Sequence, residues 1–211
     1  EEKRLNVINT PTWYVYFILY KTNLSKTLTA LLYQADVFND DIYFCGGTIL
    51  AKNEILTVGH CCDDARSMEV VVGGFNIKQS ESTQQTVYSK LIELLPNFNP
   101  FILTNDVCVV TLSSNIKLNG NTTKAVRLYQ GNNSLEGEEA IVAGWGVRSD
   151  STSSISPVLL HASDNVISNS ECKRYFLIVR DSTICLNGRN RRSACYGDVD
   201  EHLQLTAKKL A

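Results

Sequence analysis

The chain has 211 residues, of which 44% are hydrophobic, and its 20 basic and 22 acidic side chains give a formal net charge of −2. A chain of this length can form one large domain or two small ones. Its nearly neutral charge gives no electrostatic reason to expect nucleic acid as a partner. Tyr, Val, Thr and Ile occur in short runs separated by Asn, Ser and Gly, so the sequence favours an all-β protein.

Residues 1–32 form a separate N-terminal segment. The apolar run at 13–20 is too short to span a bilayer, which takes about 20 residues. The flanking residues 1–4 are mixed in charge and lack the positive region of a normal signal peptide. We interpret the run as a strand or as the remnant of a leader.

From Tyr33 onward, short apolar runs alternate with polar turns. This pattern predicts strands rather than helices. We expect strands at residues 33–38, 42–50, 68–73, 83–95, 107–112, 140–147 and 159–168.

The segment 44–62, FCGGTILAKNEILTVGHCC, has two apolar runs around a charged turn, as in a β-hairpin. It ends in His60, Cys61 and Cys62. An isolated His-Cys is usually a structural histidine beside a cystine, and zinc held by Cys45 with these three residues is another alternative. Adjacent cysteines after a histidine do not follow a common zinc spacing, which disfavours the zinc interpretation.

The whole pattern of this segment closely resembles the histidine segment of the chymotrypsin/trypsin-like serine proteases. A second segment carries Asn105-Asp106 directly before the uncharged run 107–112. A partly buried carboxylate there needs a partner, although an Asn-Asp turn before a strand is the simpler alternative. The segment also resembles the family's Asn-Asp-Ile-Ala-Leu-Leu, whose Asp orients the catalytic histidine. The resemblance therefore implies that Asp106 pairs with His60.

A third segment, SACYGDVD at 193–200, resembles the family's Cys-x-Gly-Asp-Ser-Gly-Gly-Pro. In that alignment Gly197 takes the oxyanion-hole position and Ser193 the specificity-pocket position, where serine implies a preference for large apolar side chains. Val199 takes the nucleophile position, and Asp200 replaces the first glycine. Valine has no oxygen that could attack a carbonyl, so the sequence predicts an inactive site.

The resemblance covers residues 33–199 and implies two Greek-key β-barrels. The first spans about 33–114, a linker follows at 115–137, and a partial second barrel at 138–199 opens with Gly144-Trp145-Gly146. The family's Ile-Val-Gly-Gly start and the last strands of its second barrel are missing. Residues 200–211 form a tail outside the family pattern, whose apolar spacing predicts a short helix. Unpaired edges of an incomplete barrel would favour self-association.

The family pattern pairs Cys45 with Cys61 and Cys172 with Cys185. The usual partner of Cys195 lies in the missing region. Because seven cysteines is an odd number, at least one thiol is free or intermolecular if the others pair.

Cys108, in the uncharged run, is most simply a small buried hydrophobic residue, and Cys62 is left unassigned. Phe75 stands where calcium-binding relatives carry an acidic residue, so we assign no calcium site. We also expect no other metal and no cofactor.

The cysteines, together with sequons at Asn23, Asn121 and Asn132, favour a secreted glycoprotein. We expect a serine-protease homologue, inactive as written, that binds protein or peptide ligands. The alternative is an active endopeptidase in its native full-length form, of which this chain is a mis-spliced or truncated version. A β-rich interaction protein without protease ancestry is disfavoured by the His60-Cys61 and Trp145 matches.

Overall fold

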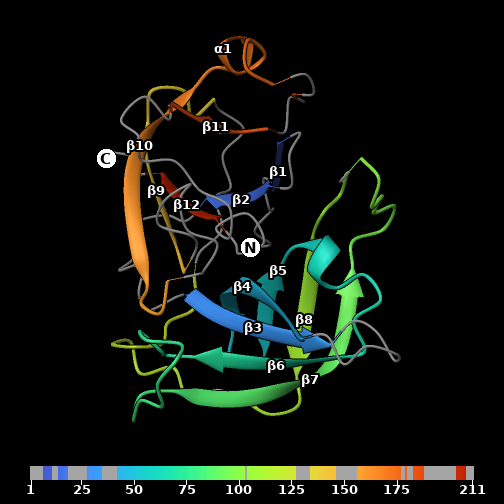
Figure 1. Ribbon diagram of the computed structural model, residues 1–211, viewed down its shortest axis with the longest axis vertical. Helices are drawn as coiled ribbons and strands as arrows, with labels where there is room; N and C mark the ends of the chain where they lie inside the picture. The colour runs from blue at the N-terminus through green and yellow to red at the C-terminus, as the bar shows by residue number, and fades with distance from the viewer. Residues whose placement is uncertain are drawn as a thin grey trace.

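A computed structural model of the chain describes residues 7–10, 14–18, 28–34, 42–102, 104–126, 134–145, 156–176, 179, 183–187 and 203–207. These residues form a mostly β structure (Figure 1) with one 3₁₀ turn and one four-residue helix. The strands are β1 Val7–Thr10, β2 Tyr14–Ile18, β3 Leu28–Gln34, β4 Ile42–Ala51, β5 Glu54–Thr57, β6 Ser67–Val72, β7 Gln85–Leu94, β8 Cys108–Leu112, β9 Glu139–Gly144, β10 Leu160–Ile167, β11 Cys185–Leu186 and β12 Leu203–Ala207. The 3₁₀ turn spans Gly59–Cys61, and helix α1 spans Asn169–Cys172.

Six strands close into a barrel in the order β3-β4-β5-β8-β7-β6, with β6 pairing back onto β3 (Figure 1). Every neighbouring pair in it is antiparallel. The side chains of strand β6 show how the sequence provides the inside of the barrel. Met68, Val70 and Val72 alternate with less buried residues and point into the barrel, as the two-residue period of a strand requires. Ile49, Ile55 and Leu56 complete a core without solvent exposure.

The remaining strands form an open sheet in the order β1-β2-β12-β9-β10-β11. Trp145 follows β9 and is buried. Its indole Nε1 donates a hydrogen bond to the carbonyl oxygen of Phe75, 3.1 Å away. That same carbonyl accepts from the backbone N–H of Leu159 at 3.0 Å. The loop after β6 thereby joins the barrel to the second sheet, whose described strands do not close into a barrel.

The tail was expected to be a helix, and that prediction is wrong for residues 203–207. Leu203 and Leu205 pair with β2, and Thr206 and Ala207 pair with β9, so this segment is strand β12. A helix this short is marginal in isolation. A strand between two others gains backbone hydrogen bonds on both sides.

The first barrel strand also differs from its expected position. Strand β3 begins at Leu28, upstream of the expected Tyr33, and residues 35–41 lie outside the described part of the chain. The run at 13–20 contains strand β2, as one of its two interpretations predicted. Among the described residues, no helix is long and apolar enough to cross a membrane.

Candidate active site

His60 lies in the 3₁₀ turn that follows β5. The carbonyl oxygen of Gly59 closes the turn by accepting from the backbone N–H groups of Cys62 and Asp63, at 2.8 and 2.9 Å. Upstream, the hydroxyl of Thr57 donates to the carbonyl of Gly46 at 3.1 Å, which fixes the end of β5 against β4. The His60 side chain is thus held at the end of the barrel, with 18% of its surface exposed.

Asp106 is positioned by the residue before it. Asn105 adopts a left-handed backbone conformation (φ 54°), which asparagine tolerates better than most residues. Its side-chain amide donates to the carbonyl of Asn97 at 3.1 Å, and its own carbonyl accepts from Val107 N–H at 2.7 Å. This turn directs the Asp106 side chain inward, where it is fully buried.

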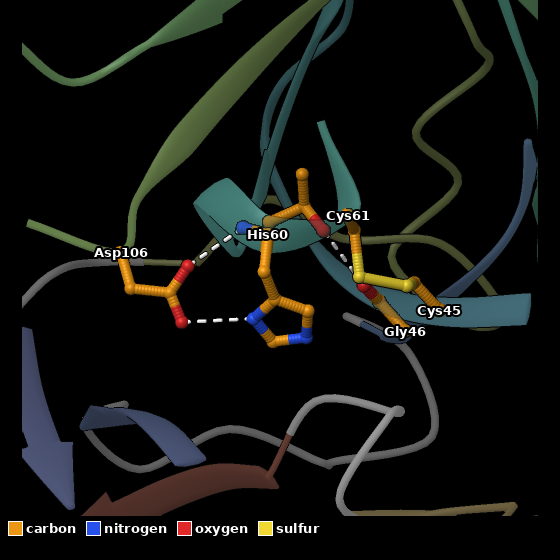
Figure 2. Close-up of polar contacts among 6 residues, drawn as sticks. Cys45, Gly46, His60, Cys61 and Asp106 are labelled. Atoms are coloured by element: carbon orange, nitrogen blue, oxygen red, sulfur yellow. Dashed lines mark hydrogen bonds and ion pairs between the residues drawn. A yellow bond between two sulfur atoms is a disulfide. The ribbon is translucent and has the colours of Figure 1, made fainter. Parts of the chain in front are cut away.

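The two residues meet through two hydrogen bonds (Figure 2). Asp106 Oδ1 accepts from the backbone N–H of His60 at 2.7 Å, and Asp106 Oδ2 lies 2.9 Å from His60 Nδ1. A carboxylate accepts hydrogen bonds and does not donate them, so Nδ1 carries the proton. In a neutral imidazole, Nε2 then offers its lone pair. Nε2 is buried and has no hydrogen-bond partner in the part of the chain that the structure describes.

Gly59, directly before His60, has no space for a side chain. A Cβ at Gly59 would lie 2.9 Å from a ring carbon of Phe98 and 3.0 Å from Asp106 Oδ1. Real Cβ atoms essentially never come within 3.0 Å of another atom, so a side chain at position 59 would force its neighbours to shift. Glycine at position 59 therefore allows the carboxylate to reach the backbone N–H of His60.

Among the residues that the structure describes, three disulfides form: Cys45–Cys61, Cys62–Cys108 and Cys172–Cys185. The first and third are the bonds that the resemblance implied. These bonds also exclude the zinc alternative at His60, because Cys45, Cys61 and Cys62 are not free thiols.

The second disulfide corrects the interpretation of Cys108 as a small buried hydrophobic residue. Thr57 and Cys108 are register partners, so the start of β8 lies beside the turn that carries Cys62. No local sequence pattern signalled this bond. Strands β5 and β8 are antiparallel, so a contact between His60 and Asp106 does not by itself place the residues two positions further along each segment side by side.

The other predicted site residues divide into two groups. Asn121 lies exposed in the linker. Asn23, Asn132, Ser193, Gly197 and Val199, together with Cys195, lie outside the described residues. Of the predicted catalytic set, the structure brings together His60 and Asp106.

Comparisons with known proteins identify the family. The trypsin family model matches residues 25–199, most of the chain. The chain belongs to the trypsin family. It is similar to brachyurin from Leptuca pugilator, with 36% identity over 168 residues that cover 79% of this chain and 73% of that protein. It is also similar to chymotrypsin from Phaedon cochleariae, with 33% identity over 161 residues covering 73% of this chain and 56% of that protein.

Two solved structures share the fold of this chain. The structure of HL collagenase superimposes with a TM-score of 0.75 at 26% identity, covering 90% of this chain and 80% of that one. The structure of GrC gives a TM-score of 0.74 at 24% identity, covering 91% and 83%.

Proposed function

We propose that this chain is a serine-protease homologue that lacks peptidase activity as written and acts by binding protein or peptide ligands. The observation that carries the proposal is a valine, Val199, at the nucleophile position of a chain whose His60–Asp106 pair is fully formed. In a triad of this type, Nε2 of the histidine takes the proton of the nucleophile's hydroxyl, and the Asp holds the imidazole in the correct tautomer.

The base and the orienting carboxylate of such a triad have equivalents in this chain, but the nucleophile does not. Asp106 orients His60, and Nε2 presents a lone pair that could accept a proton. Valine has no O–H to give and no oxygen to attack a carbonyl carbon. Asp200 stands where the motif has its first glycine, next to the backbone N–H groups that would stabilise an oxyanion. The base and its orienting partner therefore have no group on which to act.

Ligand binding can be tested with fluorescent peptides. Ser193 at the specificity-pocket position implies a large apolar side chain in the ligand. We expect peptides with a central Phe or Tyr to bind saturably in fluorescence anisotropy and to be recovered intact by mass spectrometry. The variant Ser193→Asp should shift the preference to Lys or Arg peptides, as an acidic pocket does in trypsin. Equal binding of all peptides to both proteins, or cleavage of any of them, would refute the proposal.

A second candidate function is serine-type endopeptidase activity in a native full-length form, with this chain a mis-spliced or truncated version. The observation that favours it is the intact His60–Asp106 geometry, since decay of a dead protease should reach all triad positions. The gene sequence after the codon for Asp198 separates the two candidates. A Ser-Gly-Gly-Pro continuation supports the endopeptidase, and a continuation through Val199 supports the binding protein.

We further propose secretion and self-association. Three disulfides are typical of proteins that fold in an oxidising compartment. In the described part of the second sheet, β1 and β11 are edge strands, and an exposed edge is a template for pairing with another chain. The self-association is tested below together with the remaining cysteine.

A further inference from the structure

The linker between the two sheets contains a tight turn that begins at Asn119. The side-chain oxygen of Asn119 accepts from the backbone N–H groups of Asn121, Thr122 and Thr123, at 2.8, 2.8 and 3.2 Å. Gly120 adopts the left-handed conformation that the turn needs (φ 71°), and its N–H donates to the Thr123 carbonyl at 2.9 Å. The turn is fixed by its own hydrogen bonds.

The two ends of the Asn121-Thr122-Thr123 sequon have opposite environments. Asn121 is exposed, and its carboxamide has no hydrogen-bond partner among the residues described. Thr123 is fully buried. Its hydroxyl donates to the carbonyl of Lys117 at 2.6 Å and accepts from the backbone N–H of Asn119 at 3.3 Å.

We propose that Asn121 carries an N-linked oligosaccharide and that the oligosaccharide is attached before this turn folds. An enzyme that recognises Asn-x-Thr must reach both the Asn carboxamide and the hydroxyl of the Thr. In the folded chain it would find the carboxamide in solvent but the hydroxyl buried and engaged. The exposed Asn121 then leaves room for a bulky glycan once the turn has formed.

The transfer step balances with a lipid-linked oligosaccharyl diphosphate as donor. The Asn121 amide nitrogen forms a bond to the anomeric carbon of the first sugar. The bond from that carbon to the diphosphate oxygen breaks, and the diphosphate leaves with the electron pair. The amide nitrogen gives up one proton.

The glycan would lie at the end of the barrel opposite His60. The linker is anchored on the turn between β4 and β5, where Leu112 N–H donates to the Asn53 carbonyl and Ile116 N–H to the Lys52 carbonyl, both at 2.8 Å. His60 follows the other end of β5. A sugar on Asn121 therefore leaves the His60 end uncovered, whatever that end binds.

The test uses the full chain with Asn23→Gln and Asn132→Gln, secreted from eukaryotic cells behind a cleavable signal peptide. We expect one mobility shift that an N-glycan amidase removes and that Asn121→Gln abolishes, while the matched variant Asn115→Gln retains it. Mass spectrometry of the peptide containing residue 121, from the unsubstituted secreted chain, gives an independent measurement. An unmodified Asn121 in that peptide would overturn the proposal.

The order of events has its own test. Microsomes containing the transferase and its donor are added to unglycosylated chain, either folded with intact disulfides or reduced and unfolded. We expect modification of Asn121 in the unfolded chain and at most one tenth as much in the folded chain. Equal modification of both would refute attachment before folding.

Discussion

At the scale of single residues, Asp106 contacts both the backbone and the side chain of His60 in the candidate site. Its carboxylate lies fully buried and accepts one hydrogen bond from the backbone and one from the imidazole of His60. A buried carboxylate is tolerated only when it is paired or hydrogen-bonded. The pair therefore serves the fold as well as any chemistry, so its presence does not require a nucleophile beside it.

Asp106→Ala tests this structural role. The change leaves the backbone N–H of His60 without its acceptor, and an unsatisfied buried donor costs about 1–3 kcal/mol. We expect a loss of this size in the free energy of unfolding, measured by urea denaturation. The control Glu93→Ala removes an exposed carboxylate and should change it by less than about 0.5 kcal/mol. Equal stability of the two variants would contradict the role.

Tyr88 gives a prediction about pH. Its hydroxyl donates to Glu69 Oε2 at 3.0 Å across the β6–β7 pair. This hydrogen bond, and then the negative charge of Glu69, raise the pKa of Tyr88 above its ordinary value of 10.0. Because the pKa of Tyr88 is higher in the folded chain than in the unfolded chain, this interaction stabilises the fold at pH values below the ordinary pKa. The stabilisation is lost as the pH rises through the pKa of the folded state.

Glu69→Gln should lower the pKa of Tyr88, because it removes the charge that opposes the phenolate. The measurement is an ultraviolet absorbance titration, with Tyr88→Phe identifying the contribution of this tyrosine among the nine in the chain. An unchanged titration in the Glu69 variant would show that the cross-strand hydrogen bond does not form.

At the scale of elements, the Cys62–Cys108 disulfide joins the turn that carries His60 to the strand that follows Asp106. The Cys45–Cys61 disulfide joins the same turn to β4. The turn is therefore attached covalently to two strands of the barrel. Removing Cys62–Cys108 should affect the stability of the fold and the distance between His60 and Asp106.

The double variant Cys62→Ala/Cys108→Ala should lose about 2–4 kcal/mol of unfolding free energy, since the bond closes a 46-residue separation. It should also change the NMR signals of the His60 imidazole. The matched variant Cys172→Ala/Cys185→Ala lowers stability by opening a 13-residue separation in the other sheet. Its His60 signals should stay unchanged. Identical His60 spectra in both variants would contradict a positioning role.

The sequence predicted most barrel strands because their signal is local. Buried and less buried residues alternate along β6, and β8 is a run without charge, so each strand can be recognised from a few consecutive residues. The pairing of His60 with Asp106 came from motifs, since nothing in their spacing places them together. What was missed depends on contacts distant in the chain. The Cys62–Cys108 bond needs the β5–β8 register, and β12 is a strand because β2 and β9 lie on either side of it.

Considered as a whole molecule, the chain has seven cysteines, and the described disulfides use six of them. The remaining one is Cys195. We expect one reactive thiol per chain in a titration of unfolded, unreduced protein, or a dimer on a non-reducing gel that reduction converts to monomer. Two or more thiols per monomer would show that one of the three disulfides does not form.

Pairing through the sheet edges is separable from pairing through Cys195. In Cys195→Ser, the proposed self-association predicts that sedimentation still shows association that increases with protein concentration, because β1 and β11 each pair on one side only among the described strands. A monomer at all concentrations would exclude pairing through the edges.

The proposed function requires that a chain with an intact His60–Asp106 pair does not hydrolyse peptides. The most direct measurement offers the folded chain Phe and Tyr ester substrates and a fluorophosphonate that labels reactive serines, with chymotrypsin as positive control. We expect no labelling and no turnover above that of His60→Ala. Turnover or labelling that His60→Ala abolishes, and that the exposed-histidine control His161→Ala preserves, would contradict it.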